Sequence, residues 1–294
     1  MTKTEIKFKL GDFMLTFINK VIAMILIPFV MNPSLPVLSV LKLVYAEKEL
    51  ISLSENEVGS DEDPVYLTAH RGVTAKAPEN TIPAYEAAVA EGYYTAECDI
   101  QLTKDNVWVL NHNDTTDKMF FEMGNVSDYT LEELKGFTYR QGVNFWQEGL
   151  EIATLDEYLD VFVGTETRPQ IEIKADGYDM LYTVVEAVEA KGLTEQAIVI
   201  SFDFGQLEAI HAINPDIELW YLIDEITAEE IARAKSLSDK VWLSPDFEDN
   251  DQASIQLALD AGINVSFWTV NTVKDAKMLY EMGVRYIETD ILCN

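Results

Sequence analysis

The 294-residue chain has the composition of a globular protein with a large negative charge. Apolar residues make up 48% of it, enough for a sizeable core, and 51 acidic against 21 basic side chains give a formal charge of −30. This charge argues against binding to nucleic acid and against recruitment by anionic lipids. Two cysteines, Cys98 and Cys293, are too few for a disulfide framework and lack a zinc-ligand spacing.

The first 46 residues differ in composition from the rest of the chain. An apolar run at 21–31 follows a lysine-containing segment, and "VYA" at 44–46 resembles a small-residue cleavage site. We interpret residues 1–46 as a secretory signal or a membrane anchor, which predicts a secreted or membrane-anchored extracellular protein with possible membrane association. An amphipathic arm packed on the domain is the alternative. Residues 47–63 are polar and are expected to be a linker to a folded domain at 64–294.

From residue 64 onward, short β-branched runs alternate with helical patterns. The runs predict strands at 65–70, 95–100, 168–174, 197–202, 217–223, 240–245, 264–270 and 284–290. Alternation of this kind predicts parallel strands that are covered by helices. Eight such strands close an α/β fold of the TIM, or (β/α)8, type.

Two parts of the pattern differ from a regular barrel. Residues 107–112 follow the second strand too closely for a crossover helix, so we expect a β-hairpin outgrowth after strand two. Little sequence follows the eighth strand, so the eighth helix is expected to be missing or replaced, with part of the N-terminal apolar arm as a candidate.

Polar residues gather at the carboxyl ends of the first three predicted strands and of the hairpin, where a barrel of this type has its active site. They are His70, Arg71, Glu97, Asp99, His112, Glu172 and Lys174. Carboxylates, imidazoles and cationic side chains in one place suit a divalent cation, a phosphate and a pair of proton-transfer groups.

The stretch "ECDI" at 97–100 holds two acids around a cysteine. Because side chains alternate along a strand, Glu97 and Asp99 share one face and Cys98 lies on the other. If the acids face the lumen, Cys98 packs in the helix layer as a small hydrophobe. Carboxylates at a barrel mouth repel one another unless a cation neutralises them, and all-oxygen ligands favour calcium or magnesium over zinc.

Several segments together resemble the glycerophosphodiester phosphodiesterase family. They are "AHRGVTAKAPENTIPAYEAAVAEG", "AECDIQLTKDNVWVLNHND", "IEIK", "FWTVN" and "GVRYIETD", in this order between residues 67 and 290. The resemblance implies a (β/α)8 barrel with a divalent cation, Ca²⁺ or Mg²⁺, as cofactor. It also implies roles for single residues: Glu97, Asp99 and Glu172 as metal ligands, His70 as general base, His112 as general acid, and Arg71 and Lys174 as phosphate contacts.

The resemblance further implies a metal-dependent phosphodiesterase that converts a small-molecule glycerophosphodiester to glycerol 3-phosphate and an alcohol. Either a glycerol hydroxyl attacks the phosphorus and gives a cyclic phosphate that water opens, or water attacks directly. One alternative is a phospholipase D-like member that acts on lysolipids or sphingolipids. Another is a non-catalytic module that binds a phosphate ligand on the same barrel.

Residues near the motifs complete the expectations. Glu79 and Asn80 are expected to shape the first loop and to cap the helix that begins near Thr81. Trp268 is either a wall of the substrate pocket or a core tryptophan. Asn113 stands where the family usually has Asp. We expect the loss of this charge to alter the pKa of His112 or the substrate pocket. The long segment 115–150 is either a lid or a packed addition.

Overall fold

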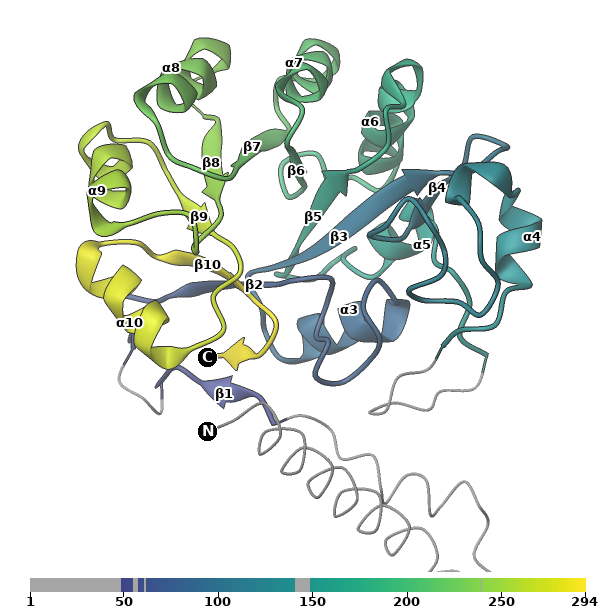
Figure 1. Cartoon of the computed structure of the whole chain (residues 1–294), viewed down its shortest axis with the longest axis horizontal. Coiled ribbons are helices and arrows are strands. Elements are labelled where there is room, and N and C mark those ends of the chain that lie inside the picture. The colour runs from purple at the N-terminus through teal and green to yellow at the C-terminus, as the bar shows by residue number, and fades with distance from the viewer. Residues whose placement is uncertain (1–48, 55–57, 61, 141–148, 239) are drawn as a thin grey trace, which may run out of the picture. The chain divides into compact units, whose positions relative to one another are not determined.

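A computed structural model of the chain describes residues 49–54, 58–60, 62–140, 149–238 and 240–294, drawn as the coloured ribbon of Figure 1. The predicted signal or anchor at 1–46 lies outside these residues and stays a prediction. Across the described ranges, every helix is too short or too polar to cross a membrane.

Eight parallel strands form the wall of the barrel, in the spatial order β8-β7-β6-β5-β3-β2-β10-β9. Their bounds are Tyr66–Ala69 (β2), Thr95–Leu102 (β3), Arg168–Ile173 (β5), Ile198–Ser201 (β6), Glu218–Ile223 (β7), Trp242–Pro245 (β8), Ser266–Phe267 (β9) and Tyr286–Thr289 (β10). The two ends of this order, β8 and β9, meet through single parallel bridges, Leu243 to Val265 and Asp246 to Trp268, so the barrel is nearly closed. The predicted TIM barrel is therefore confirmed.

Helices cover the outside of the strands (Figure 1). They are α3 (Ile82–Ala90), α5 (Leu155–Asp160), α6 (Leu181–Ala190), α7 (Phe204–Ile213), α8 (Ala228–Leu237), α9 (Gln252–Asp260) and α10 (Val273–Met282). Most begin at a Thr or Asp whose side chain accepts a hydrogen bond from the first turn, as Thr154 does from Glu157 before α5. Helix α10 ends at Gly283, whose φ of 101° suits a residue without a Cβ.

The predicted hairpin is present. Strand β4 (Trp108–Leu110) pairs antiparallel with the end of β3, with Leu110 opposite Ile100. The chain then forms the short elements η2 (Val126–Asp128) and α4 (Leu131–Lys135), and η3 (Tyr178–Met180) precedes α6. Part of segment 115–150 packs in a small apolar cluster with Val109 and Ile152, in which Phe120 and Leu134 are fully buried. The described residues of this segment are therefore a packed addition beside the barrel.

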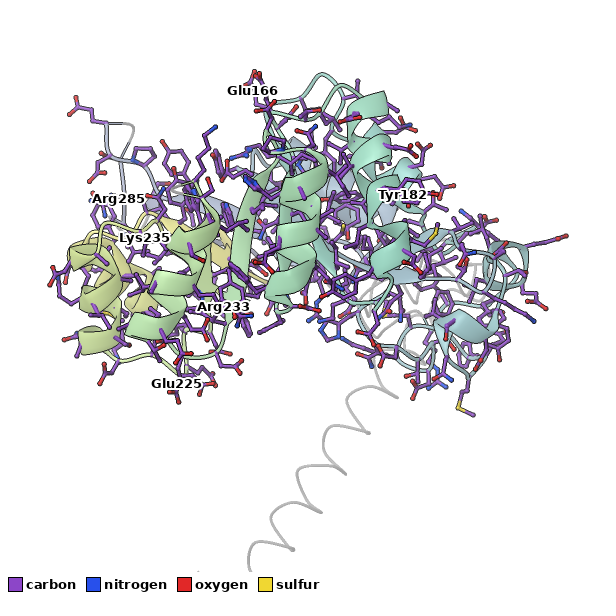
Figure 2. All side chains as sticks on the ribbon, turned by 90° about the horizontal axis from the view of Figure 1, so that it is seen from above. Glu166, Tyr182, Glu225, Arg233, Lys235 and Arg285 are labelled. Atoms are coloured by element: carbon purple, nitrogen blue, oxygen red, sulfur yellow. The ribbon has the colours of Figure 1, made fainter. Side chains whose placement is uncertain are left out.

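Aromatic side chains and an arginine fill the end of the barrel where the strands begin. Tyr66 stacks on Tyr286 with ring centroids 4.7 Å apart, and Trp220 stacks on Trp242 at 4.9 Å. Figure 2 shows Glu166 and Arg285 at this rim of the molecule and Glu225, which follows β7, at the opposite rim.

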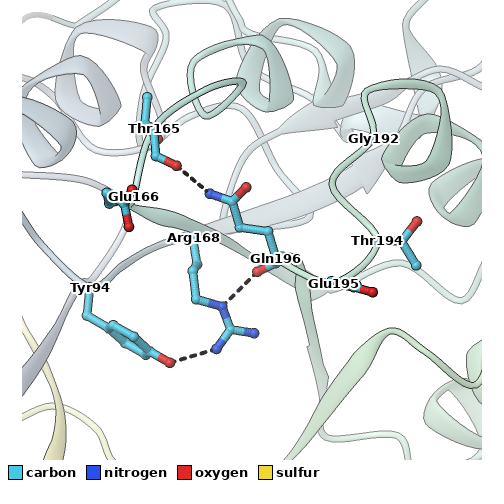
Figure 3. Close-up of a pocket in the computed structure, with 8 residues that line it drawn as sticks. All are labelled: Tyr94, Thr165, Glu166, Arg168, Gly192, Thr194, Glu195 and Gln196. Atoms are coloured by element: carbon cyan, nitrogen blue, oxygen red, sulfur yellow. Dashed lines mark hydrogen bonds between the residues drawn. The ribbon is translucent and has the colours of Figure 1, made fainter.

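A cavity at the same rim is lined by Arg168, whose guanidinium is hydrogen-bonded to Tyr94 and Gln196 (Figure 3). Arg168 donates to Tyr94 Oη, the backbone oxygen of Gln196 and Glu218 Oε2, each at 2.8 Å. Three of its five N–H donors are thus engaged, and its charge is paired with that of Glu218.

The polar stretch before the barrel is only partly a linker, which corrects the prediction for 47–63. Strand β1 (Ile51–Ser52) pairs in parallel with β11 (Leu292–Cys293), which follows β10 where an eighth helix would stand. Leu53 is fully buried in the main core, and its backbone N–H donates to Cys293 O at 2.7 Å. A strand of two residues has no hydrophobic period to read, so only the structure shows this packing.

We expect Leu53→Ala to lower the free energy of unfolding by about 2–5 kcal/mol, because it removes a fully buried side chain from the core. Ile51→Ala is the matched control, since Ile51 lies two residues away and is 37% exposed. Urea unfolding followed by circular dichroism measures both variants. Equal small effects would show that this segment is not part of the cooperative unit.

Candidate active site

Four acidic residues of the described chain are buried, and all lie on the strands β3, β5 and β10 of the barrel: Glu97, Asp99, Glu172 and Glu288. Asp99 stands opposite Glu172 in the register of β3 with β5, so the two carboxylates project from adjacent positions. One oxygen each of Glu97, Asp99 and Glu172 lie within 4.8 Å of one another. The structure therefore brings the three predicted metal ligands together.

Glu288 on β10 is an additional member of this group that the sequence interpretation missed. It is 4% exposed, and its Oε1 lies 3.8 Å from His70 Nε2. His70, Glu97 and Glu288 form a second set of ligand atoms within 4.8 Å, which shares Glu97 with the first. The alternation of "IETD" placed Glu288 and Asp290 on one face of the last strand, and that signal was available in the sequence.

Burial and mutual repulsion act differently on these carboxyl groups. Burial, together with Asp99, raises the pKa of Glu97 well above its ordinary value and the pKa of Glu172 to about 7. Burial also raises the pKa of Glu288 to about 7. For Asp99 the effect of burial is outweighed by Arg71 and other cationic neighbours, so its pKa is lowered. Negative charge is thus concentrated at Asp99.

Two oxygens of this group have no hydrogen-bond partner in the described part of the chain, although they are buried: Glu97 Oε1 and Asp99 Oδ1. A buried carboxylate oxygen without a partner is costly. Both residues belong to the set with Glu172, and oxygen donors at this spacing suit a hard divalent cation. The residues present therefore fit a cation site at the mouth of the barrel.

Asn80 holds Asp99 in place, which corrects its predicted role as a helix cap. Asn80 Nδ2 donates to Asp99 Oδ2 at 2.8 Å, and Asn80 Oδ1 accepts from the Asp99 backbone N–H at 3.1 Å. The cap position of α3 is Thr81, without a side-chain cap bond. Asn80 has a φ of 56°, a conformation that Asn tolerates better than most residues, and this turns its amide inward.

Arg71 and Lys174 supply positive charge beside the carboxylates. The backbone N–H of Arg71 donates to Glu97 Oε2 at 2.8 Å, and its Nε lies 3.4 Å from Asp99 Oδ2. Lys174 Nζ lies 2.8 Å from Glu172 Oε1 and 3.9 Å from Asp99 Oδ1. Glu79 connects this cluster to the added segment, since it accepts from Arg71 at 3.3 Å and from Lys118 at 2.6 Å.

His70 has a carboxylate partner. Its Nδ1 lies 2.8 Å from Asp290 Oδ1, and Asn271 Nδ2 donates to the other oxygen of Asp290 at 2.7 Å. Burial lowers the pKa of His70, but the hydrogen bond with Asp290 and the charge of Glu288 outweigh it, so the pKa is raised. Arg71 acts in the opposite sense, because its Nε donates to the other ring nitrogen, Nε2, at 3.1 Å.

His112 has an amide partner instead. Its Nδ1 lies 2.8 Å from Asn113 Oδ1, and its Nε2 lies 4.0 Å from Asp99 Oδ1. Burial is the main reason that the pKa of His112 is lowered, despite the charge of Asp99. Because Asn113 stands where the family usually has Asp, the Nδ1 of this imidazole faces an amide and not a carboxylate.

Two further predicted residues are placed by the structure. Trp268, next to the end of β9, is half-buried and donates from Nε1 to Ser244 O at 2.8 Å. Its ring makes a T-shaped contact with Phe202, with centroids 5.7 Å apart. Its contact with substrate stays a prediction. Cys98 is fully buried in the main core, and burial raises the pKa of its thiol, so its predicted packing role is confirmed.

The sequence model of the "Glycerophosphoryl diester phosphodiesterase family" matches residues 70–292. A glycerophosphodiester phosphodiesterase of Caldanaerobacter subterraneus subsp. tengcongensis is 29% identical over 231 residues, which cover 76% of this chain and 93% of the relative. Another, from Bacillus altitudinis, is 30% identical over 231 residues, which cover 76% of this chain and 94% of the relative.

A solved structure supports the same fold. The phosphodiesterase of Oleispira antarctica, solved in complex with the product sn-glycerol-3-phosphate, superposes with a TM-score of 0.70 at 23% identity and covers 82% of this chain and 96% of that one. At this identity the likeness shows the barrel fold.

We expect Asn80→Gly to lower the free energy of unfolding by about 1–3 kcal/mol, because a buried Asp99 loses two hydrogen bonds. Asn106→Gly is the matched control: Asn106 has a φ of 62° but lies exposed in the β3–β4 turn. Chemical denaturation of both variants measures the difference. If the two substitutions have the same effect, backbone conformation and not the contact with Asp99 accounts for it.

Proposed function

Because the chain belongs to the glycerophosphoryl diester phosphodiesterase family and is a phosphodiesterase, we propose that it hydrolyses glycerophosphodiesters with a divalent cation and two proton-transferring histidines. The products would be sn-glycerol 3-phosphate and an alcohol. The observation that carries the proposal is the group of buried carboxylates at the barrel mouth with His70 and His112 beside it. Family membership argues for an enzyme over the non-catalytic binding module.

The cation would be held by Glu97, Asp99 and Glu172. Support comes from the two buried oxygens without partners and from the spacing of the three carboxylates. Oxygen ligands favour Ca²⁺ or Mg²⁺. When bound, such an ion supplies charge stabilisation to the phosphoryl oxygens.

Arg71 and Lys174 would bind the phosphate. Both are partly buried, with side-chain exposures of 15% and 20%, and both lie beside Asp99. A phosphodiester next to these groups meets positive charge although the protein as a whole is strongly acidic. This local charge resolves the conflict between an anionic substrate and an acidic chain.

His70 and His112 would move protons in opposite directions. One imidazole takes the proton of the attacking hydroxyl, from glycerol or from water, while the other protonates the oxygen of the departing alcohol. Support comes from their unequal partners, since a carboxylate on Nδ1 favours a charged imidazole and an amide does not. If a glycerol hydroxyl attacks, the cyclic phosphate that forms is opened by water, with the two roles exchanged.

We expect His112→Ala to lower the rate of sn-glycerol 3-phosphate release by about 10²- to 10⁴-fold, the usual contribution of a proton-transfer group. His211→Ala is the matched control, because His211 is the third histidine of the chain and lies on α7. An enzyme-coupled assay for sn-glycerol 3-phosphate, run with several glycerophosphodiesters, measures both. Full activity of the His112 variant would remove this residue from the mechanism.

We also expect Ca²⁺ or Mg²⁺, at a concentration 100 times the dissociation constant, to raise the free energy of unfolding by about 2.7 kcal/mol relative to chelator. Asp99→Asn should abolish this increase, because Asp99 supplies one of the unpaired oxygens. Asp216→Asn removes the same charge at an exposed position and should keep it. Chemical denaturation with and without chelator measures this increase. The same increase in the free energy of unfolding in the Asp99 variant would refute the site.

A further inference from the structure

A second feature of the barrel mouth is a cavity of about 790 Å³ that begins at Lys174. It lies between the end of β3, the segment that follows β5, and the loop that follows His112. Lys174 Nζ is 3.5 Å from His112 Nε2, so the cavity starts where the proposed phosphate site ends. Its size is in the range of small-ligand sites.

The walls of this cavity are polar and partly preorganised. Gln101, which is 5% exposed, donates from Nε2 to Asp114 Oδ1 at 3.1 Å and fixes this carboxylate at the wall. Within the described part of the chain, the side chains of Lys104, Asn106 and Asp176 form no hydrogen bond to protein. The cavity therefore presents free donors and free acceptors.

The charges at the cavity balance, and its lining lacks an aromatic face. Lys104 and Lys174 stand against Asp114 and Asp176, two positive against two negative side chains. Among the described residues that line it, none is aromatic. Recognition of a quaternary ammonium group depends on aromatic faces, and an acyl chain needs apolar walls. Neither group matches this cavity.

We propose that this cavity binds the alcohol part of the substrate and selects a neutral polyhydroxylated alcohol, such as glycerol or inositol, over choline. The inference rests on the proposed function and deepens it. Hydroxyl groups both donate and accept, so they match a wall where amide, ammonium and carboxylate groups alternate. Because Lys174 lines the cavity and its Nζ lies 3.5 Å from His112 Nε2, a group attached to the phosphate on this side meets the cavity entrance.

The test compares kcat/KM for glycerophosphoglycerol and glycerophosphocholine. Both substrates release sn-glycerol 3-phosphate, so one coupled assay with a divalent cation serves for both. We expect glycerophosphoglycerol to be preferred by about tenfold, the effect of one or two hydrogen bonds that involve a charged group.

Lys104→Ala tests the cavity itself. It removes a donor that suits a polyol and leaves a net negative charge that suits choline, so the preference should fall by about fivefold or more. Lys277→Ala removes the same charge from the exposed face of α10 and should leave the preference unchanged.

The outcomes separate this inference from the proposed function. Turnover of both substrates without preference overturns the inference alone. An equal loss on both substrates in Lys104→Ala also overturns it, because the cavity would then hold the glycerol common to both. Release of sn-glycerol 3-phosphate from neither substrate, or from any other glycerophosphodiester, overturns the proposed function and the inference with it.

Discussion

The repulsion among Glu97, Asp99, Glu172 and Glu288 is the constraint on which the rest of the site depends. Hydrogen-bonded strands of the barrel wall cannot move apart, so these buried carboxyl groups cannot separate to relieve it. The cationic, amide and imidazole side chains at the mouth can be understood as responses to this charge. Asp99 receives most of the compensation, and Glu97 and Glu172 receive less, which is why their pKa values move in opposite directions.

Much of this arrangement could be predicted from the sequence, because it follows from periodicity. The period of two along "ECDI" put Glu97 and Asp99 on one face and Cys98 in the packing between barrel and helices, where the structure has it. The alternation of strands and helices predicted the barrel. Since the carboxyl ends of its strands meet at one mouth, it also predicted that side chains more than 70 positions apart would lie together.

The features that the sequence did not reveal depend on contacts without a period. Asn80 looked like a helix cap because Asn is common there, but its positive φ turns the amide towards Asp99. Leu53 and Val58 lie in a polar stretch. Their burial depends on the pairing of β1 with β11, two short strands that precede and follow the barrel strands in the sequence. Glu288 was visible in the last strand, and the predicted barrel already placed that strand next to the first; its 3.8 Å approach to His70 is seen only in the structure.

The difference between the two histidines connects these features. Asp290 directly follows β10, so the strand that carries Glu288 also positions the Nδ1 partner of His70. His112 lies in the loop after β4 and has only the neutral Asn113. A carboxylate beside each imidazole would favour two positively charged rings next to Arg71 and Lys174. Repulsion among these four positive charges would oppose that arrangement. The amide at Asn113 removes that conflict, because burial then lowers the pKa of His112 while Asp290 helps to raise the pKa of His70.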